Sequence, residues 1–583
     1  MVGKFASDLQ EIYDVILKDY HFDDIQETRE IYGEIRHLLT NYMRNHKRVG
    51  IYCYGEHTKH LMVDFVYELR NIVCIIDNGD ICTNSQGFKI IKDYDIEALA
   101  LDGIIVSSYK YRDEVKKSLN DNHKGVEVLD IYDYLEISRE FYAVDSAYSC
   151  YKTIHDLHKK NQKEPSQEIL LALVKEYLKI KDFRLASEIS KELYGFTNEE
   201  KYNLLYQRIK CLYDNCLSVL RNANQAVCLI CVDGLRGIEL SRDGKLNKTY
   251  ETIKKRGKIF SNAYSYSTST YETLIPVFTE KIATKSLGDV SEAEASECRF
   301  VQHARRQGRT VYIYGSDKYI VGDGLKHKEG SFTITQLLWY FILDLCKEGC
   351  GLFYLQPVYE SHFTFPSPYF TGDELILDGT SILYDYTGTK GEKIRGEYVE
   401  QYDAAIKYID DTLAPVIEAL SCKTMLFADH GNYDYRIFDE KDLSATNPVE
   451  LVVGKDLFHI PLAIVSSNEV KEENNELISL MEFNEIVISL LDGCEYKHAS
   501  KKWIHIARTP IYNPDYKYIF SNIFDAEYLL CAFEGFVFPD GMRLMVFSDK
   551  TKILLDDKGE TSIADSDMIE KYFSLVEGNV TIL

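Results

Sequence analysis

Five short runs of apolar residues in the later part of the chain each adjoin a polar side chain. The runs lack the alternation of apolar and polar residues that marks a half-exposed strand, so they predict strands buried on both faces of a mostly parallel sheet. In open sheets of this kind, functional side chains gather at the carboxyl ends of the strands. The runs and their neighbours are 226–232 before Asp233, 310–314 before Asp317, 352–355 before His362, 424–428 before Asp429 and His430, and 460–465 after His459.

Three regions can be separated along the 583 residues, which are too many for one hydrophobic core. Residues 1–138 begin with helical periodicity and continue as strands that alternate with helices, so they predict a small Rossmann-like domain with leading helices. Residues 139–222 predict a helical linker. Residues 223–583 predict an α/β catalytic domain, with a β-rich subdomain from about residue 500. The strands expected in the first region start at Val49 and cover 72–76, 103–107 and 126–131.

The turn after the first of these strands leaves two functions open for the Rossmann-like domain. It reads Tyr-Gly-Glu-His at 54–57, without the glycine fingerprint of dinucleotide-binding domains, although Asp77 stands where a ribose-binding acid would. The domain either binds a nucleotide or nucleotide-sugar, or it only docks or scaffolds. The stretch resembles the start of small Rossmann-like domains in sugar-modifying proteins of bacterial surface-glycan pathways.

The charge and hydropathy of the chain exclude some classes of partner. The formal net charge is -25, with 92 acidic against 67 basic residues, so a nucleic-acid partner is not expected. No apolar run is long enough to span a bilayer, and the N-terminus lacks the apolar centre of a signal peptide. We therefore expect a cytoplasmic protein without a membrane span. Its oligomeric state is left open.

A metal site is indicated more strongly by the combination of Asp233, Asp429 and His430 than by any one of these residues. An Asp after a strand is usually a cap or turn residue, and a single His usually packs or lies exposed. Two carboxylates and an imidazole at one edge of a sheet offer two hard oxygens and one nitrogen, a set that suits Zn²⁺ or Mn²⁺. A Thr hydroxyl would complete the set.

Four segments resemble motifs of the alkaline phosphatase superfamily. Segments 232–236 and 428–431 are similar to its first metal motif and its Asp-His-Gly motif. Segment 268–278 resembles the nucleophile segment of bacterial phosphoethanolamine transferases, and segment 360–365 resembles the substrate-binding segment of lipoteichoic acid synthases. The order and spacing of the four segments agree with this branch of the superfamily.

The resemblance covers about residues 224–500 and implies an α/β/α sandwich of the alkaline phosphatase type. It implies one divalent ion, Zn²⁺ or Mn²⁺. A second ion stays open, because Val358 follows Pro357 where a related branch places a metal-binding Asp. The roles that it implies are Thr270 as nucleophile, Asp233, Thr270, Asp429 and His430 as metal ligands, and His362, His459 and Arg236 as substrate-binding residues.

The reaction that the resemblance implies is phosphoryl transfer through a phosphothreonine. We expect a phosphotransferase that acts on a small-molecule or glycan phosphoester, with a glycan precursor as one candidate acceptor. A phosphodiesterase or phosphohydrolase of the same superfamily is an alternative, because water and an alcohol attack from the same position. A non-catalytic binding protein with the same fold is the alternative from another class. A formylglycine sulfatase is not expected, because Thr270 stands where such enzymes need Cys or Ser.

Overall fold

The computed structural model of the protein describes most of the chain. The described residues are 2–22, 29–65, 68–69, 71–78, 89–123, 125–135, 141, 147–281, 292–315, 319–330, 332–362, 364–373, 375, 391–433, 447–466, 469–511, 517, 520–556 and 566–581.

The body of the molecule is a nine-stranded sheet in the order β11-β9-β12-β6-β13-β14-β7-β15, in which β16 also pairs with β7. Every pairing is parallel except those that β14 makes with β13 and β7. The mostly parallel central sheet predicted from the apolar runs is therefore confirmed. Its strands are β6 (Val227–Cys231), β7 (Gly257–Tyr264), β9 (Val311–Gly315), β11 (Leu325–Glu329), β12 (Leu352–Leu355), β13 (Lys423–Phe427), β14 (His459–Val465), β15 (Glu472–Asn474) and β16 (Ile478–Ser479).

The directions of these strands bring four loops to one edge of the sheet. β6, β7, β12 and β13 run the same way, so the segments that follow them start from the same edge. β14 runs the opposite way, and its first residue, His459, therefore lies at this edge too. The carboxyl edge of the main sheet is thus where the predicted site residues begin.

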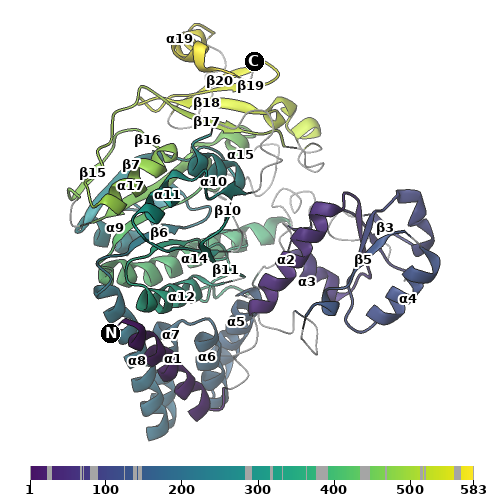
Figure 1. Cartoon of the computed structure of the whole chain (residues 1–583), viewed down its shortest axis with the longest axis vertical. Coiled ribbons are helices and arrows are strands. Elements are labelled where there is room, and N and C mark those ends of the chain that lie inside the picture. The colour runs from purple at the N-terminus through teal and green to yellow at the C-terminus, as the bar shows by residue number, and fades with distance from the viewer. Residues whose placement is uncertain are drawn as a thin grey trace.

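Helices cover both faces of the main sheet and complete an α/β/α sandwich (Figure 1). Successive residues of β12 show the two faces, because Phe353 packs on Phe341 of α12 whereas Tyr354 packs on Phe278 of α10. α10 packs with α11 and α17, and α12 packs with α14, which also covers α9. The helices of this region are α9 (Asn247–Lys254), α10 (Thr270–Thr279), α11 (Arg299–Arg306), α12 (Ile334–Lys347), α14 (Gly391–Ala419), α15 (Glu450–Val453), α16 (Lys455–Phe458) and α17 (Phe483–Asp492). A short parallel pair is formed by β8 (Ala293–Glu294) and β10 (Ile320–Val321).

The helical linker packs below the main sheet in the view of Figure 1, together with the first helix of the chain. Tyr13 of that helix contacts the rings of Phe183 and Trp339, so the helix shares one hydrophobic core with the linker and α12. From the sequence, this helix was predicted to belong to the Rossmann-like domain at 1–138. These helices are α1 (Val2–Asp19), α5 (Ala147–Lys163), α6 (Gln167–Lys179), α7 (Phe183–Thr197) and α8 (Glu200–Arg221).

A second, five-stranded parallel sheet lies to the right of the body in Figure 1, in the order β3-β2-β1-β4-β5. The separate hydrophobic clusters that flank it are those of a Rossmann-like layer structure. Strand β3 was missed by the sequence analysis. The elements are α2 (Arg29–Asn45), β1 (Val49–Tyr52), α3 (Glu56–Asp64), β2 (Ile72–Ile76), β3 (Lys89–Ile91), β4 (Gly103–Val106), α4 (Arg112–Asn122) and β5 (Glu127–Leu129).

The polar residues around the turn after β1 are engaged with one another. Asp77 Oδ2 accepts a hydrogen bond from Tyr54 N at 2.7 Å. His57 is buried, with its ring nitrogens 2.9 Å from Ser107 Oγ and 2.6 Å from Tyr132 OH. Burial lowers the pKa of His57 to about 3, so its imidazole is neutral. Asp77 and His57 therefore hold this turn in place.

The chain ends in a four-stranded antiparallel sheet in the order β17-β18-β19-β20, against which α19 packs. A hydrogen bond of 2.8 Å from Ala507 N to Tyr266 O joins it to the main domain. Among the described residues, no helix has both the length and the apolar character needed to cross a membrane. The elements are β17 (Ile504–Arg508), β18 (Phe533–Val537), β19 (Arg543–Phe547), β20 (Lys552–Leu555) and α19 (Ser566–Val576).

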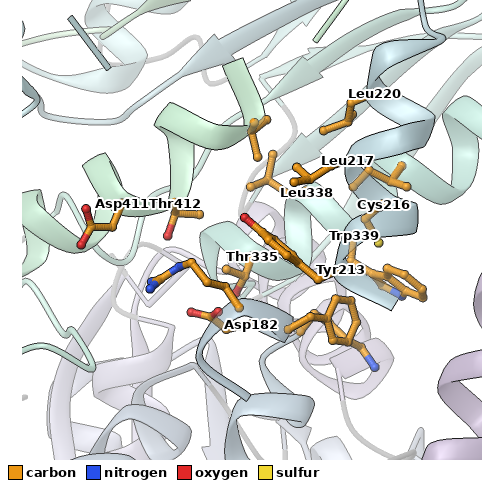
Figure 2. A pocket seen from close by; sticks show the side chains of 15 residues that line it. Asp182, Tyr213, Cys216, Leu217, Leu220, Thr335, Leu338, Trp339, Asp411 and Thr412 are labelled. Atoms are coloured by element: carbon orange, nitrogen blue, oxygen red, sulfur yellow. The ribbon is translucent and has the colours of Figure 1, made fainter. Parts of the chain in front are cut away.

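A pocket opens where the helical linker meets α12 and α14 (Figure 2). Its wall is largely apolar, with Trp339 and Leu217 among the side chains that line it. Asp182 also lines it, but its carboxylate already accepts hydrogen bonds from Leu185 N and Tyr408 OH. The lining includes none of the predicted site residues.

Candidate active site

Three loops at the carboxyl edge of the main sheet bring the predicted metal ligands together. Asp233 lies just beyond β6, Asp429 and His430 lie just beyond β13, and Thr270 begins α10 after β7. One ligand atom from each of Asp233, Asp429 and His430 lies within 4.8 Å of the others. Thr270 Oγ1 lies 3.3 Å from Asp233 Oδ2 and 3.4 Å from His430 Nε2. Residues far apart in sequence thus form one compact polar cluster.

The carboxylate oxygens of Asp233 and Asp429 differ in what they contact. Asp233 Oδ2 accepts a hydrogen bond of 3.0 Å from Gln356 Nε2, and Asp429 Oδ1 accepts one of 3.1 Å from Gly234 N. Asp233 Oδ1 and Asp429 Oδ2 are buried and have no hydrogen-bond partner among the described residues. They lie 3.8 and 3.6 Å from His430 Nε2. Two buried, anionic oxygens without donors are unfavourable unless a cation lies between them.

The ring of His430 is oriented to offer a lone pair to the same point. Its Nδ1 lies 2.7 Å from the carbonyl oxygen of Gly431, a contact that requires a proton on Nδ1. In the neutral ring Nε2 then carries no proton, and it is Nε2 that faces the two carboxylates. A backbone carbonyl that fixes the tautomer in this way is a common support for a metal-binding histidine. The donor set therefore fits one divalent ion such as Zn²⁺ or Mn²⁺.

The electrostatics of the cluster without a cation are unbalanced. Burial and the neighbouring charge of Asp429 raise the pKa of Asp233 to about 6. Burial opposes a charge on His430, but Asp429 and Asp233 outweigh it and raise the pKa of the imidazole. The raised pKa values mean that Asp233 and His430 both tend to hold a proton when no cation is present. A bound dication would supply the positive charge that these protons otherwise provide.

Thr270 is distinguished from the other hydroxyl residues of its segment by where its oxygen lies. Ser267 Oγ donates to Glu272 Oε2, and Ser265 Oγ donates to the carbonyl oxygen of Ser267. Ser269 is the N-cap of α10, is exposed, and makes no capping hydrogen bond through its side chain. Thr270, as the first residue of α10, also lies where the N–H groups of the opening turn favour anionic oxygen.

Gly234 allows the loop after β6 to approach Asp429. Its φ is +64°, in the left-handed region that favours glycine. A Cβ at this position would lie 3.6 Å from both His430 Cε1 and Ser361 O. The tight turn directs Gly234 N toward Asp429 Oδ1 and leaves Oδ2 of the same carboxylate facing the imidazole.

Gln356 also contacts this cluster and was not predicted from the sequence. It follows β12 directly, much as Asp233 follows β6 after one residue. The same pattern, a polar residue after an apolar strand, could therefore have identified Gln356 from the sequence. Tyr354 OH donates to Gln356 Oε1 at 2.9 Å, which directs the amide nitrogen toward Asp233. Gln356 is almost fully buried, with 1% of its surface exposed.

His362 lies further along the loop after β12 and is half-buried. The ring of His362 is among the groups that lower the pKa of Asp233, so it lies near the cluster. The loop is anchored by Glu360 Oε1, which accepts hydrogen bonds from Ile334 N at 2.9 Å and from the hydroxyl of Tyr151. His362 is absent from the group of side chains that could share one ion among the described residues.

Arg236 and His459, both predicted to bind substrate, are engaged in other contacts. Arg236 is buried, pairs with Glu239 at 2.5 Å and lies over the ring of Tyr402. The ring of His459 lies at the same edge, with Nε2 2.9 Å from the carbonyl oxygen of Ser261. Both substrate roles stay predictions. Asp317, which follows β9, lies outside the described residues.

One family model matches part of the chain, and it covers the Rossmann-like domain. Residues 45–128 match the model described as C2185-like, N-terminal. This region runs from the end of α2 into β5. No curated protein matches the sequence.

Several solved structures are similar to part of the chain. Phosphonate monoester hydrolase of Agrobacterium radiobacter is 12% identical, with a TM-score of 0.43, over 62% of this chain and 95% of that chain. The soluble domain of lipooligosaccharide phosphoethanolamine transferase A from Neisseria meningitidis is 16% identical, with a TM-score of 0.33, over 46% of this chain and 88% of that chain. The C-terminal periplasmic domain of a phosphoethanolamine transferase from Campylobacter jejuni is 16% identical, with a TM-score of 0.33, over 46% of this chain and 89% of that chain. These three are proteins of the alkaline phosphatase-like superfamily.

Proposed function

We propose that this chain is a metal-dependent phosphoryl transferase in which Thr270 carries the phosphoryl group from a phosphoester donor to an acceptor hydroxyl. The observation that supports the proposal is the convergence of two buried carboxylate oxygens, without hydrogen-bond partners among the described residues, on His430 Nε2 beside Thr270 Oγ1. Such a cluster disfavours a purely structural role, because it leaves buried charge uncompensated until a cation binds.

The residues of the chain have distinct tasks in this reaction. A divalent ion bound by Asp233 Oδ1, Asp429 Oδ2 and His430 Nε2 would supply Lewis acidity at the Thr270 oxygen and at the phosphoryl group. Asp233 Oδ2, 3.3 Å from Thr270 Oγ1, is placed to hold the hydroxyl proton. Thr270 Oγ1 then bonds to phosphorus, and the donor's bridging oxygen leaves with its electron pair. In the second step an acceptor hydroxyl attacks phosphorus and releases its proton to solvent, and the bond from phosphorus to the Thr270 oxygen breaks. Asp233 Oδ2 returns the hydroxyl proton to Thr270.

The start of α10 adds stabilisation for the charge that develops in both steps. Thr270 begins this helix, and the N–H groups of the first turn have no acceptors within the helix. Free N–H groups and the positive end of the helix dipole favour the non-bridging phosphoryl oxygens. His362, from the opposite loop, is the side chain that we assign to the substrate phosphate.

Turnover of simple phosphoesters tests the proposed function. The full chain, stripped with chelator, is incubated with a nitrophenyl phosphodiester and a nitrophenyl phosphomonoester, each with and without Mn²⁺ or Zn²⁺. We expect nitrophenol release that depends on the ion, and phosphorylated product when a sugar or other polyol is added as acceptor. Release of nitrophenol with transfer to water alone would identify the hydrolase alternative. The absence of turnover with either ion would contradict the proposal.

Replacing His362 with Ala is expected to raise KM for the phosphoester by about tenfold or more while the metal content is unchanged. The loss of one charge-assisted contact to phosphate, about 1.5–3 kcal/mol, is the reason. Steady-state kinetics and metal analysis of the same preparation measure the two effects. Loss of the ion in this variant would instead make His362 a metal ligand. His158→Ala, in the helical linker, is the matched control and should leave KM unchanged.

A further inference from the structure

The amide of Gln356 is held in place by both its backbone and its side chain. Gln356 N donates to Tyr314 O of β9 at 2.9 Å, and Pro357 O accepts from Asp233 N, just beyond β6, at 3.2 Å. The pairings of β12 with β9 and with β6 therefore continue past its last residue. Tyr354 OH fixes the amide oxygen at 2.9 Å. The amide nitrogen therefore lies against Asp233 Oδ2, at 3.0 Å, with little freedom to turn away.

The hydrogen bond from Gln356 Nε2 prevents a cation from binding at Asp233 Oδ2. An N–H group donates and cannot act as a metal ligand, so a cation at Asp233 Oδ2 would meet the hydrogens of Gln356. The same oxygen also accepts the hydroxyl of Thr270 at 3.3 Å. Only Oδ1, which has no hydrogen-bond partner among the described residues, is left to face His430 Nε2 at 3.8 Å. Asp233 can thus bind one ion through one oxygen, but cannot bridge two.

We propose that Gln356 is a positioning residue that restricts the centre to a single metal ion and reserves Asp233 Oδ2 for the Thr270 hydroxyl. The inference rests on the proposed function, because it concerns the same ion. Two-metal sites hold their ions about 3.5–4 Å apart. A carboxylate that binds one ion through each of its oxygens must keep both oxygens free of hydrogen-bond donors. The Gln356 amide blocks that arrangement without adding negative charge. A glutamate of the same shape would remove the donor and supply a further anionic oxygen beside Asp233.

Metal titration tests this role independently of turnover. Chelator-stripped wild type is titrated with Mn²⁺ and with Zn²⁺ by calorimetry, and we expect one equivalent to bind. Gln356→Ala should also bind one equivalent, with affinity lowered by about 10- to 100-fold, the usual effect of removing a group that orients a metal ligand. Gln356→Glu should bind a second equivalent. Gln302→Glu, whose Nε2 contacts the backbone of Ala295 well away from the centre, is the matched control and should titrate as wild type.

The outcomes separate this inference from the proposed function. If wild type binds one ion and both Gln356 variants titrate as wild type, the positioning role is wrong and the proposed function stands. If wild type binds no ion, both are wrong. Tyr354→Phe removes only the hydroxyl that fixes the amide, so it provides a second test should Gln356→Glu fail to fold. It should weaken metal binding several-fold without adding an equivalent, and unchanged affinity would count against the proposal.

Discussion

Thr270→Ala is expected to lower the turnover of a phosphodiester by roughly four orders of magnitude or more, because nucleophile and metal-binding hydroxyl are lost together. The oxygen that disappears is the one that lies 3.3 Å from Asp233 Oδ2 and 3.4 Å from His430 Nε2. Thr270→Ser keeps a hydroxyl at this position and should retain measurable turnover. Initial rates of nitrophenol release at saturating metal ion give the ratio.

The neighbouring hydroxyl residues serve as controls for the assignment of Thr270. Ser269→Ala changes an exposed residue whose side chain makes no capping hydrogen bond, so its turnover should stay near that of wild type. If a hydroxyl of this segment served only to cap α10, its loss would cost about 1 kcal/mol of stability and little turnover. Trapping with a slowly resolved phosphodiester and peptide mass spectrometry should locate the phosphoryl group on Thr270. A phosphoryl group on Thr268 or Ser269 would show that another hydroxyl is the nucleophile.

Replacing Asp429 and His430 together with Ala is expected to abolish metal binding and, with it, turnover. Two of the three side chains that converge on one point are lost, and Asp233 alone cannot hold a divalent ion tightly. Protein purified without chelator should contain about one equivalent of metal in the wild type and close to none in the variant. Metal analysis by mass spectrometry provides the measurement. Unchanged metal content in the variant would show that the ion is bound elsewhere.

Thermal unfolding gives a second, independent measurement for the same variant. An ion that binds only the folded state stabilises it by about 2.7 kcal/mol when its concentration is a hundred times the Kd. Wild type should therefore melt at a higher temperature with the ion, and the double variant should not. His303→Ala with Asp492→Ala is the matched control, because it removes a His–Asp contact of 2.6 Å on the exposed surface of α11 and α17. Its response to the ion should equal that of wild type.

The strands of the main sheet could be predicted because their signal is local. Apolar runs such as 227–231 and 425–427 are fully buried, and they can be recognised without knowing which other surfaces pack on them. The polar residue after each run is local information too, and the common direction of β6 and β13 then brings Asp233 and Asp429 to one edge. For this part of the site, order along the chain was enough. Thr270 was assigned from the motif resemblance of segment 268–278, and the strand before it, β7, was not among the predicted runs.

Other features depend on which surfaces meet, and sequence alone did not supply them. The first helix has the same amphipathic pattern whichever core it covers, and only the folded chain shows Tyr13 against Phe183 and Trp339. A strand as short as β3, with one buried residue, gives too little apolar pattern to be recognised. Arg236 belongs to the motif segment 232–236, from which a substrate-binding role was predicted. In the folded chain its guanidinium pairs with the buried carboxylate of Glu239.

The sequence by itself determined the fold class, the edge of the sheet that carries the candidate site and, through the motif resemblance as well as the strand pattern, the residues that converge there. The reason is that a buried strand and the polar residue after it are recognised from residues that are adjacent in the sequence. Only the tertiary structure decided which oxygen of each carboxylate remains available to an ion. That choice depends on Gln356 Nε2 and Gly234 N, each of which donates a hydrogen bond across a gap of more than a hundred residues. Hydrogen bonds over such separations are fixed by the packing of strands in space, and no pattern along the chain specifies them.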